Sequence, residues 1–242
     1  MAARALLERW RVTAPFVVDG ESARKFNAVY PVVAHTMAQV AASLTLRDQG
    51  LVYAARVNVR VALEHALVAQ WVVHTHQGED ALIGSMSRLH RNTVRDLSEG
   101  GAVIPPELQA DLNHPLGEPQ LKVEVIADRF DGGTKSIYGL YRHLTGAVHV
   151  SLATLAAYIK WQGEDQNTAL RVSAESDADP EQVLALAWSA VLALSAVERL
   201  RSGQPYLAAV HKLAQDHELV PDLGPFDSSP ELQRQPSAQS EV

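Results

Sequence analysis

Cysteine is absent from this sequence of 242 residues, and aromatic residues are scarce, at 6%. Without cysteine the chain can form no disulfide, no thiolate nucleophile and no thiolate-bound metal. Alanine, leucine and valine dominate instead, within a hydrophobic content of 47%. This mixture favours closely packed helices over β-sheet.

Long hydrophobic runs are also absent. The longest, 183–197, has 15 residues and contains Ser189 and Ser195, whereas a helix that spans a membrane needs about 20 apolar residues. We interpret this run as a buried helix. The N-terminal residues include Arg4 and Glu8 where a signal peptide needs an unbroken apolar core. The sequence therefore predicts a cytoplasmic protein without membrane association.

Negative charge is concentrated toward the C-terminus. The net charge is −7 at pH 7, and residues 163–242 carry 13 acidic and 5 basic side chains. Residues 1–162 are nearly balanced, with 15 acidic and 16 basic side chains. Overall acidity argues against a nucleic-acid partner, but here the argument applies mainly to the last third of the chain.

Helical patterns separated by proline and glycine predict an all-α protein, an irregular helical bundle of about six to eight helices. We expect a single helical domain over 19–218, an N-terminal arm over 1–18, and a disordered tail over 219–242, where Pro, Ser, Gln and Asp are frequent. Two long apolar helices, 51–77 and 136–162, are expected to lie side by side at its centre.

Three local signals refine this prediction. Asp179 before Pro180 is typical of a helix start, with a capping residue followed by proline at the first helical position. Pro31 lies inside a helix expected over 21–47 and predicts a kink or a division there. The piece ALRVSAE, 169–175, has the character of a strand, but a single strand would have no partner.

The first candidate site lies in the helix expected over 51–77. Arg56, Arg60 and Glu64 are spaced i, i+4, i+8 and form one stripe among Ala, Val and Leu. Because large apolar side chains project on the same side, a buried arginine there needs a partner, and Glu64 is at the right spacing. The stripe fits either structural ion pairing or contact with a ligand.

The second candidate site is the segment YGLYRHLTGAVH, which contains Tyr141, Arg142, His143 and His149. A histidine that titrates near neutral pH can act as a general base toward a ribose 2′-hydroxyl. Arg142 would hold the phosphate and stabilise its developing charge. This chemistry requires no metal or cofactor. The alternative is that His149 is a core histidine and Arg142 a surface residue.

Arg142 and His143, followed by five residues and then His149, resemble the Arg-polar-x(4–5)-His signature of the HEPN superfamily. These all-helical proteins include metal-independent ribonucleases. The resemblance implies that Arg142 and His149 are catalytic and that His143 is the auxiliary polar residue. The usual short helical bundle of that superfamily would cover only part of this chain.

A second resemblance covers more of the chain, roughly 25–162. Arg60 and Glu64 form an Arg-x3-Glu pair, and Tyr-x-x-Leu-x4-His follows about eighty residues later at Tyr141 and His149. This pattern is similar to a family of helical bacterial proteins known only as a domain of unknown function. The resemblance implies a helical fold and one shared site for the four residues, and it implies no activity.

Two functional hypotheses follow. The first is a non-catalytic protein that binds a partner or small ligand through a polar pocket of Arg, Glu, Tyr and His between core helices. The second is a HEPN-like, metal-independent endoribonuclease acting through Arg142 and His149. No cofactor or metal is expected. The partner stays undefined, with RNA or a protein as candidates, and the sequence leaves a homodimer open.

Overall fold

A computed structural model gives the fold of most of the chain. It describes residues 2–11, 16–111, 122–131, 134–149, 151–161, 170–172 and 179–224. The helices are α1 (Ala2–Arg11), α2 (Gly20–Asp48), α3 (Val52–His74), α4 (Gly78–Glu99), α5 (Pro106–Asp111), α6 (Val123–Phe130), α7 (Ser136–Thr145), α8 (Leu152–Tyr158), α9 (Pro180–Arg199) and α10 (Leu207–Asp216).

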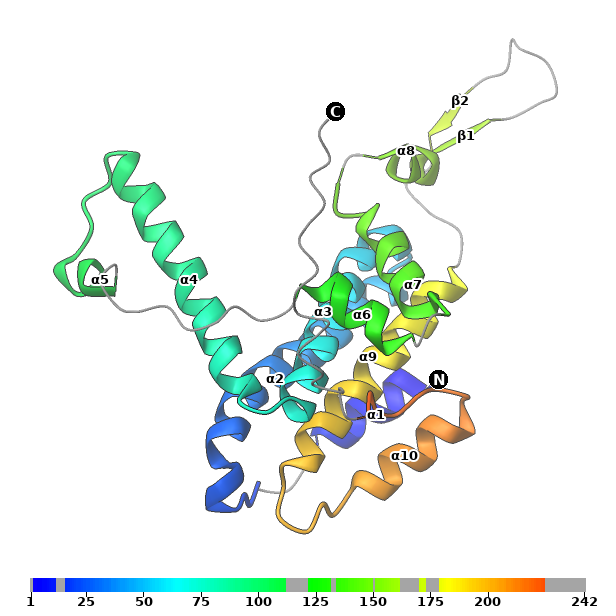
Figure 1. Cartoon of the computed structure of the whole chain (residues 1–242). Helices are drawn as coiled ribbons and strands as arrows, with labels where there is room; N and C mark the ends of the chain where they lie inside the picture. The colour runs from blue at the N-terminus through cyan, green and yellow to red at the C-terminus, as the bar shows by residue number, and fades with distance from the viewer. Residues whose placement is uncertain are drawn as a thin grey trace.

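The prediction of an all-helical bundle with long apolar helices at its centre is confirmed. The described residues form ten helices, two more than the upper expectation, because several are short. Helices α2, α3 and α9 pack against one another in the middle, and α6 and α7 cover α3 (Figure 1). Leu63, Leu67 and Leu192 are among the fully buried side chains that hold this centre together.

Of the two predicted central helices, the one over 51–77 is confirmed, and the prediction of a single helix over 136–162 is wrong. Helix α3 occupies 52–74, but 136–162 is divided into α7, a turn, α8 and the strand β1. The division follows from local chemistry, since Gly146 caps α7 and Ser151 Oγ accepts the backbone N–H of Thr154 at the start of α8. Helices α2 and α9 therefore take the central place beside α3.

The predicted strand has a partner after all. Strand β1 (Ile159–Trp161) pairs antiparallel with β2 (Leu170–Val172), with Lys160 opposite Arg171. The sequence reading missed the pairing because it assigned 159–161 to a long helix. This ribbon and α8 project from one end of the bundle (Figure 1).

Helix α9 begins as predicted at Asp179 and Pro180. Asp179 Oδ1 accepts the backbone N–H groups of Glu181 and Gln182, at 3.1 and 3.2 Å, which satisfies two donors of the first turn. Helix α2 continues through Pro31 and is not divided there. By length and composition α2 and α9 could cross a membrane, but 72% of the apolar window of α9 is buried inside the bundle.

Both ends of the described chain are attached to the core. Helix α1, in the stretch predicted as an N-terminal arm, buries Leu6 and Leu7 against the bundle. Residues 219–224, the start of the predicted disordered tail, are ordered, with Leu219 buried and the N–H of Leu223 donated to Gln70 Oε1 at 3.2 Å. Apolar and hydrogen-bonding contacts explain this difference, and 225–242 lie outside the described residues.

Candidate functional site

Arg60 is the hub of a polar contact between α3 and α7. Its guanidinium group pairs with Glu64 one turn along α3. It also donates to the hydroxyl of Tyr141, at 2.5 Å, and to Thr145 Oγ1, at 3.1 Å. The guanidinium carbon lies 4.1 Å from the centre of the Tyr141 ring, a cation–π contact. The i, i+4 spacing predicted the first of these contacts, and only the fold supplies the others.

Tyr141 is the buried member of this group, with only 4% of its surface exposed. Burial raises the pKa of its phenol, although the Arg60 charge acts in the opposite direction. Its hydroxyl also lies 3.5 Å from Glu124 Oε1 on α6. Because the phenol stays protonated, it can donate to a carboxylate while it accepts from Arg60.

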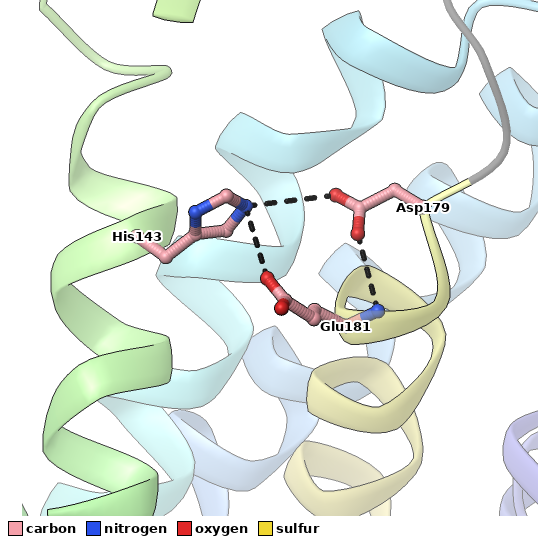
Figure 2. A group of neighbouring side chains, drawn as sticks. All are labelled: His143, Asp179 and Glu181. Carbon is pink, nitrogen blue, oxygen red and sulfur yellow. Dashed lines mark hydrogen bonds and ion pairs between the residues drawn. The ribbon is translucent and has the colours of Figure 1, made fainter.

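Arg56, one turn before Arg60, faces a different neighbour. Its guanidinium lies 2.7 Å from Asp179 Oδ2, at the start of α9, and stacks 4.9 Å from the centre of the Tyr53 ring. His143 on α7 approaches the same carboxylate, with Nε2 4.0 Å from Asp179 Oδ2 and 3.3 Å from Glu181 Oε2 (Figure 2). The α3 stripe therefore divides into two contacts, one with α7 and one with α9.

The structure places all five predicted binding residues in two neighbouring contact groups along α3, which we together name the polar belt. The polar belt consists of Arg56, Arg60, Glu64, Tyr141 and His143, together with Asp179. It follows the side of α3 that faces α7 and the first turn of α9. Two of its members, Tyr141 and Asp179, are buried, so the belt joins helices and is not a loose surface patch.

The two predicted catalytic residues are placed differently. Arg142 and His149 are both exposed. Arg142 donates to the Tyr138 hydroxyl, at 3.3 Å. His149 lies in the turn after α7, where its backbone carbonyl accepts from Thr154 Oγ1. Within the described part of the chain, the His149 imidazole makes no hydrogen bond or ion pair to Arg60 or Glu64, so the implied four-residue site is not formed by direct contacts.

A cavity of about 430 Å³ opens beside the polar belt, between α2, α3 and α4. Its wall is mostly apolar, with Glu64, His35, His65 and Ser85 as its polar members. Its apolar lining is made by Pro31, Val32, Val68, Leu82, Met86 and Leu89. Glu64 therefore belongs both to the cavity and to the ion pair with Arg60.

Two histidines are among the polar residues that line this cavity. The rings of His35 and His65 lie 5.0 Å apart. Burial lowers the pKa of His65, and the nearby His35 and Arg60 lower it further. Gln39 Nε2 lies 3.1 Å from His35 Nε2, and because an amide N–H only donates, the ring nitrogen is the acceptor in this contact. This wall therefore offers ring nitrogens, a hydroxyl and one carboxylate that is paired with Arg60.

The cluster in Figure 2 contains the donor types that a metal ion needs. His143, Asp179 and Glu181 each offer one ligand atom, and these atoms lie within 4.8 Å of one another. The two residues on α9 come from its capping position and its first turn, while His143 comes from the last turn of α7.

Several of these residues were missed by sequence reasoning. Asp179 was identified only as a helix cap, and Glu124, Glu181, His35 and His65 were not singled out. One signal was available in part, because a buried Arg56 requires a carboxylate and Asp179 begins an apolar helix. Nothing in the local sequence indicates that α2, α6 and α9 approach α3 at these positions.

Comparisons with known protein families, with curated proteins and with solved structures give no match for this chain.

Proposed function

We propose that this chain is a non-catalytic binding protein that holds a small, mostly apolar molecule in the cavity between α2, α3 and α4. The observation that carries this proposal is the composition of the cavity wall, which is apolar except for Glu64, His35, His65 and Ser85. Cavities of this size and character are typical of small-molecule sites.

The polar residues of the cavity wall limit the chemistry of the ligand. Glu64 is an acceptor whose charge is balanced by Arg60, and His65 is held toward its neutral form. An anionic head group would face Glu64 and gain no unpaired cation. A neutral head group that donates a hydrogen bond, such as a hydroxyl, would meet acceptors without burying a second charge. The ligand is therefore an apolar body with one such donor.

Three naphthalene probes that differ only in their head groups test this proposal. We expect 2-naphthol to bind with saturable calorimetric heat, and 2-naphthoate to bind at least tenfold more weakly because its carboxylate would lose hydration without meeting an unpaired cation. Naphthalene itself should fall between them. Equal binding of all three, or no binding of any, would contradict the proposed ligand class.

A matched pair of substitutions on α4 locates the site. Met86 lines the cavity and is half exposed, so Met86→Trp should fill the space and abolish binding of 2-naphthol. Ile83 lies one turn away, is similarly exposed and does not line the cavity, so Ile83→Trp is the control. Loss of binding in both variants, or in neither, would show that the probe binds elsewhere.

The exposure of Arg142 and His149 supports a second candidate, the HEPN-like ribonuclease. Both side chains are accessible to a large substrate and belong to one short segment. The test is cleavage of single-stranded RNA in the presence of EDTA, with His149→Ala and Arg142→Ala compared with the wild type. A ribonuclease predicts at least a hundredfold loss in both variants. Absent activity, or equal activity in all three proteins, would eliminate this candidate.

A further inference from the structure

Three side chains, from the last turn of α7 and the start of α9, come close together at one end of the polar belt. His143 Nε2 lies 3.3 Å from Glu181 Oε2 and 4.0 Å from Asp179 Oδ2. In Figure 2 the imidazole of α7 points toward the two carboxylates at the start of α9. Ligands held about 2.1 Å from a tetrahedral ion lie about 3.4 Å apart. Small side-chain adjustments would therefore bring all three donors to one metal ion.

Asp179 is already oriented for this role. Its Oδ1 is fixed by the backbone N–H groups of Glu181 and Gln182, which directs Oδ2 toward His143. The side chain is 7% exposed, and Oδ2 is buried without a hydrogen-bond partner. Arg56 lies 2.7 Å from Oδ2 as an ion-pair contact, but the geometry of this contact is not that of a hydrogen bond. A lone pair of a buried carboxylate oxygen is thus left for another ligand.

The charges at this point also favour a cation. Asp179 and Glu181 contribute two negative charges and Arg56 one positive charge, so a neutral His143 leaves an excess of one negative charge. The N-terminus of α9 offsets only part of a charge. Arg56 then acts in the second coordination shell, where it orients Asp179 as such partners commonly do.

We propose that His143, Asp179 and Glu181 form a binding site for a divalent transition metal of the zinc class. One imidazole nitrogen and two carboxylate oxygens match the ligand preference of Zn²⁺ and Co²⁺, whereas Mg²⁺ and Ca²⁺ prefer oxygen alone. Three protein ligands leave at least one coordination position for water. The ion links the last turn of α7 to the first turn of α9, and so closes one end of the polar belt.

Direct metal titration tests the site. The full chain, freed of metal with EDTA and dialysed, is titrated with ZnCl₂ by isothermal calorimetry and by thermal unfolding. We expect one saturable site and a Tm that rises with the zinc concentration, because zinc binds the folded state preferentially. Excess MgCl₂ should not compete.

The variants are chosen so that folding is not in question. His143 and Glu181 are exposed enough, at 40% and 60% of their side-chain surface, that His143→Ala and Glu181→Gln should fold, as circular dichroism in EDTA would verify. Each should weaken zinc binding at least tenfold. His149→Ala and His217→Ala remove other exposed histidines and should leave it unchanged.

Two results would overturn the proposal. The first is zinc binding of equal strength in His143→Ala, which would place the metal on other histidines. The second is absence of saturable zinc binding in the wild type. The site uses no residue of the α2–α3–α4 cavity, so it can be present or absent whether or not that cavity binds a ligand.

Discussion

At the scale of single residues, Arg60 shows how a charged side chain is held between helices. Its side chain is only 15% exposed, and an arginine so placed must have its charge and its donors satisfied. Glu64, Tyr141 and Thr145 provide that satisfaction from two helices. These contacts hold the Arg60 side chain in one geometry. Its ion-pair partner Glu64 also lines the adjacent cavity.

Replacing Arg60 by alanine should therefore destabilise the fold by about 2–3 kcal/mol, because Glu64 and the Tyr141 hydroxyl lose their partner and the ring contact is lost. Tyr141→Phe should cost about 1 kcal/mol, since it removes the hydroxyl alone. Urea denaturation measures both. Arg142 is an exposed arginine on α7, so Arg142→Ala is the control, and its unfolding free energy should stay within about 0.5 kcal/mol of wild type. Equal effects for the two arginines would contradict a buried role for Arg60.

At the scale of elements, the start of α9 has two tasks that a substitution can separate. Asp179 caps the helix through Oδ1 and pairs with Arg56 through Oδ2. Asparagine can still accept the cap hydrogen bonds, but it carries no charge. The Asp179 side chain therefore both caps the helix and provides the buried end of the polar belt.

We expect Asp179→Asn to lose about 1–2 kcal/mol, from the ion pair with Arg56 alone. Asp179→Ala should lose about 2–4 kcal/mol, because the cap is lost as well. Thermal and urea unfolding followed by circular dichroism give both values. Identical losses in the two variants would show that capping contributes nothing measurable at this position.

At the scale of the whole molecule, residues 219–224 connect the C-terminal ends of α3 and α9. Asp222 contacts His74 Nε2 at the end of α3, at 2.5 Å, and pairs with Arg199 at the end of α9. Leu223 is anchored to the buried Gln70, which also donates to the carbonyl of Leu192, at 2.7 Å. This segment closes the bundle opposite the end that carries α8 and the β ribbon (Figure 1).

Two truncations test that contribution. The chain without 225–242 is the reference, since it keeps the contacts just described. Removing 219–242 should lower the unfolding free energy by about 2–4 kcal/mol relative to that chain, because the buried Leu219, the Gln70 hydrogen bond and the ion pair between Arg199 and Asp222 are lost. Urea denaturation compares the two. Equal stability of both truncated chains would show that 219–224 do not hold the helices.

His74 predicts how stability depends on pH. Burial, with the nearby Arg199 and Lys25, lowers its pKa from 6.5 to about 4. As pH falls, His74 of the unfolded chain is protonated before His74 of the folded chain. The contribution of neutral, buried His74 to the unfolding free energy is therefore fully present above pH 6.5 and is lost progressively toward pH 4. His74→Gln should flatten the dependence of the unfolding free energy on pH in this window, while His149→Gln should not. An unchanged slope in His74→Gln would contradict the assignment.

The sequence alone determined the fold class, the position of α3, the capped start of α9 and the burial of its apolar run. These features depend on side chains within one or two turns of each other, and such spacing is visible in a linear chain. It also made candidates of Arg56, Arg60 and Glu64, because charged groups in an apolar helix must be paired, whereas Tyr141 and His143 became candidates through the motif at 141–149.

Only the tertiary structure decided which groups meet. Residues four apart on a helix differ by about 40° around its axis and about 6 Å along it, so Arg56 faces α9 while Arg60 faces α7. Asp179, His35 and Asp222 reach α3 from distant parts of the chain, and Glu124 reaches Tyr141 on α7. Their approach is set by the packing of whole helices, and helix packing depends on all buried surfaces at once.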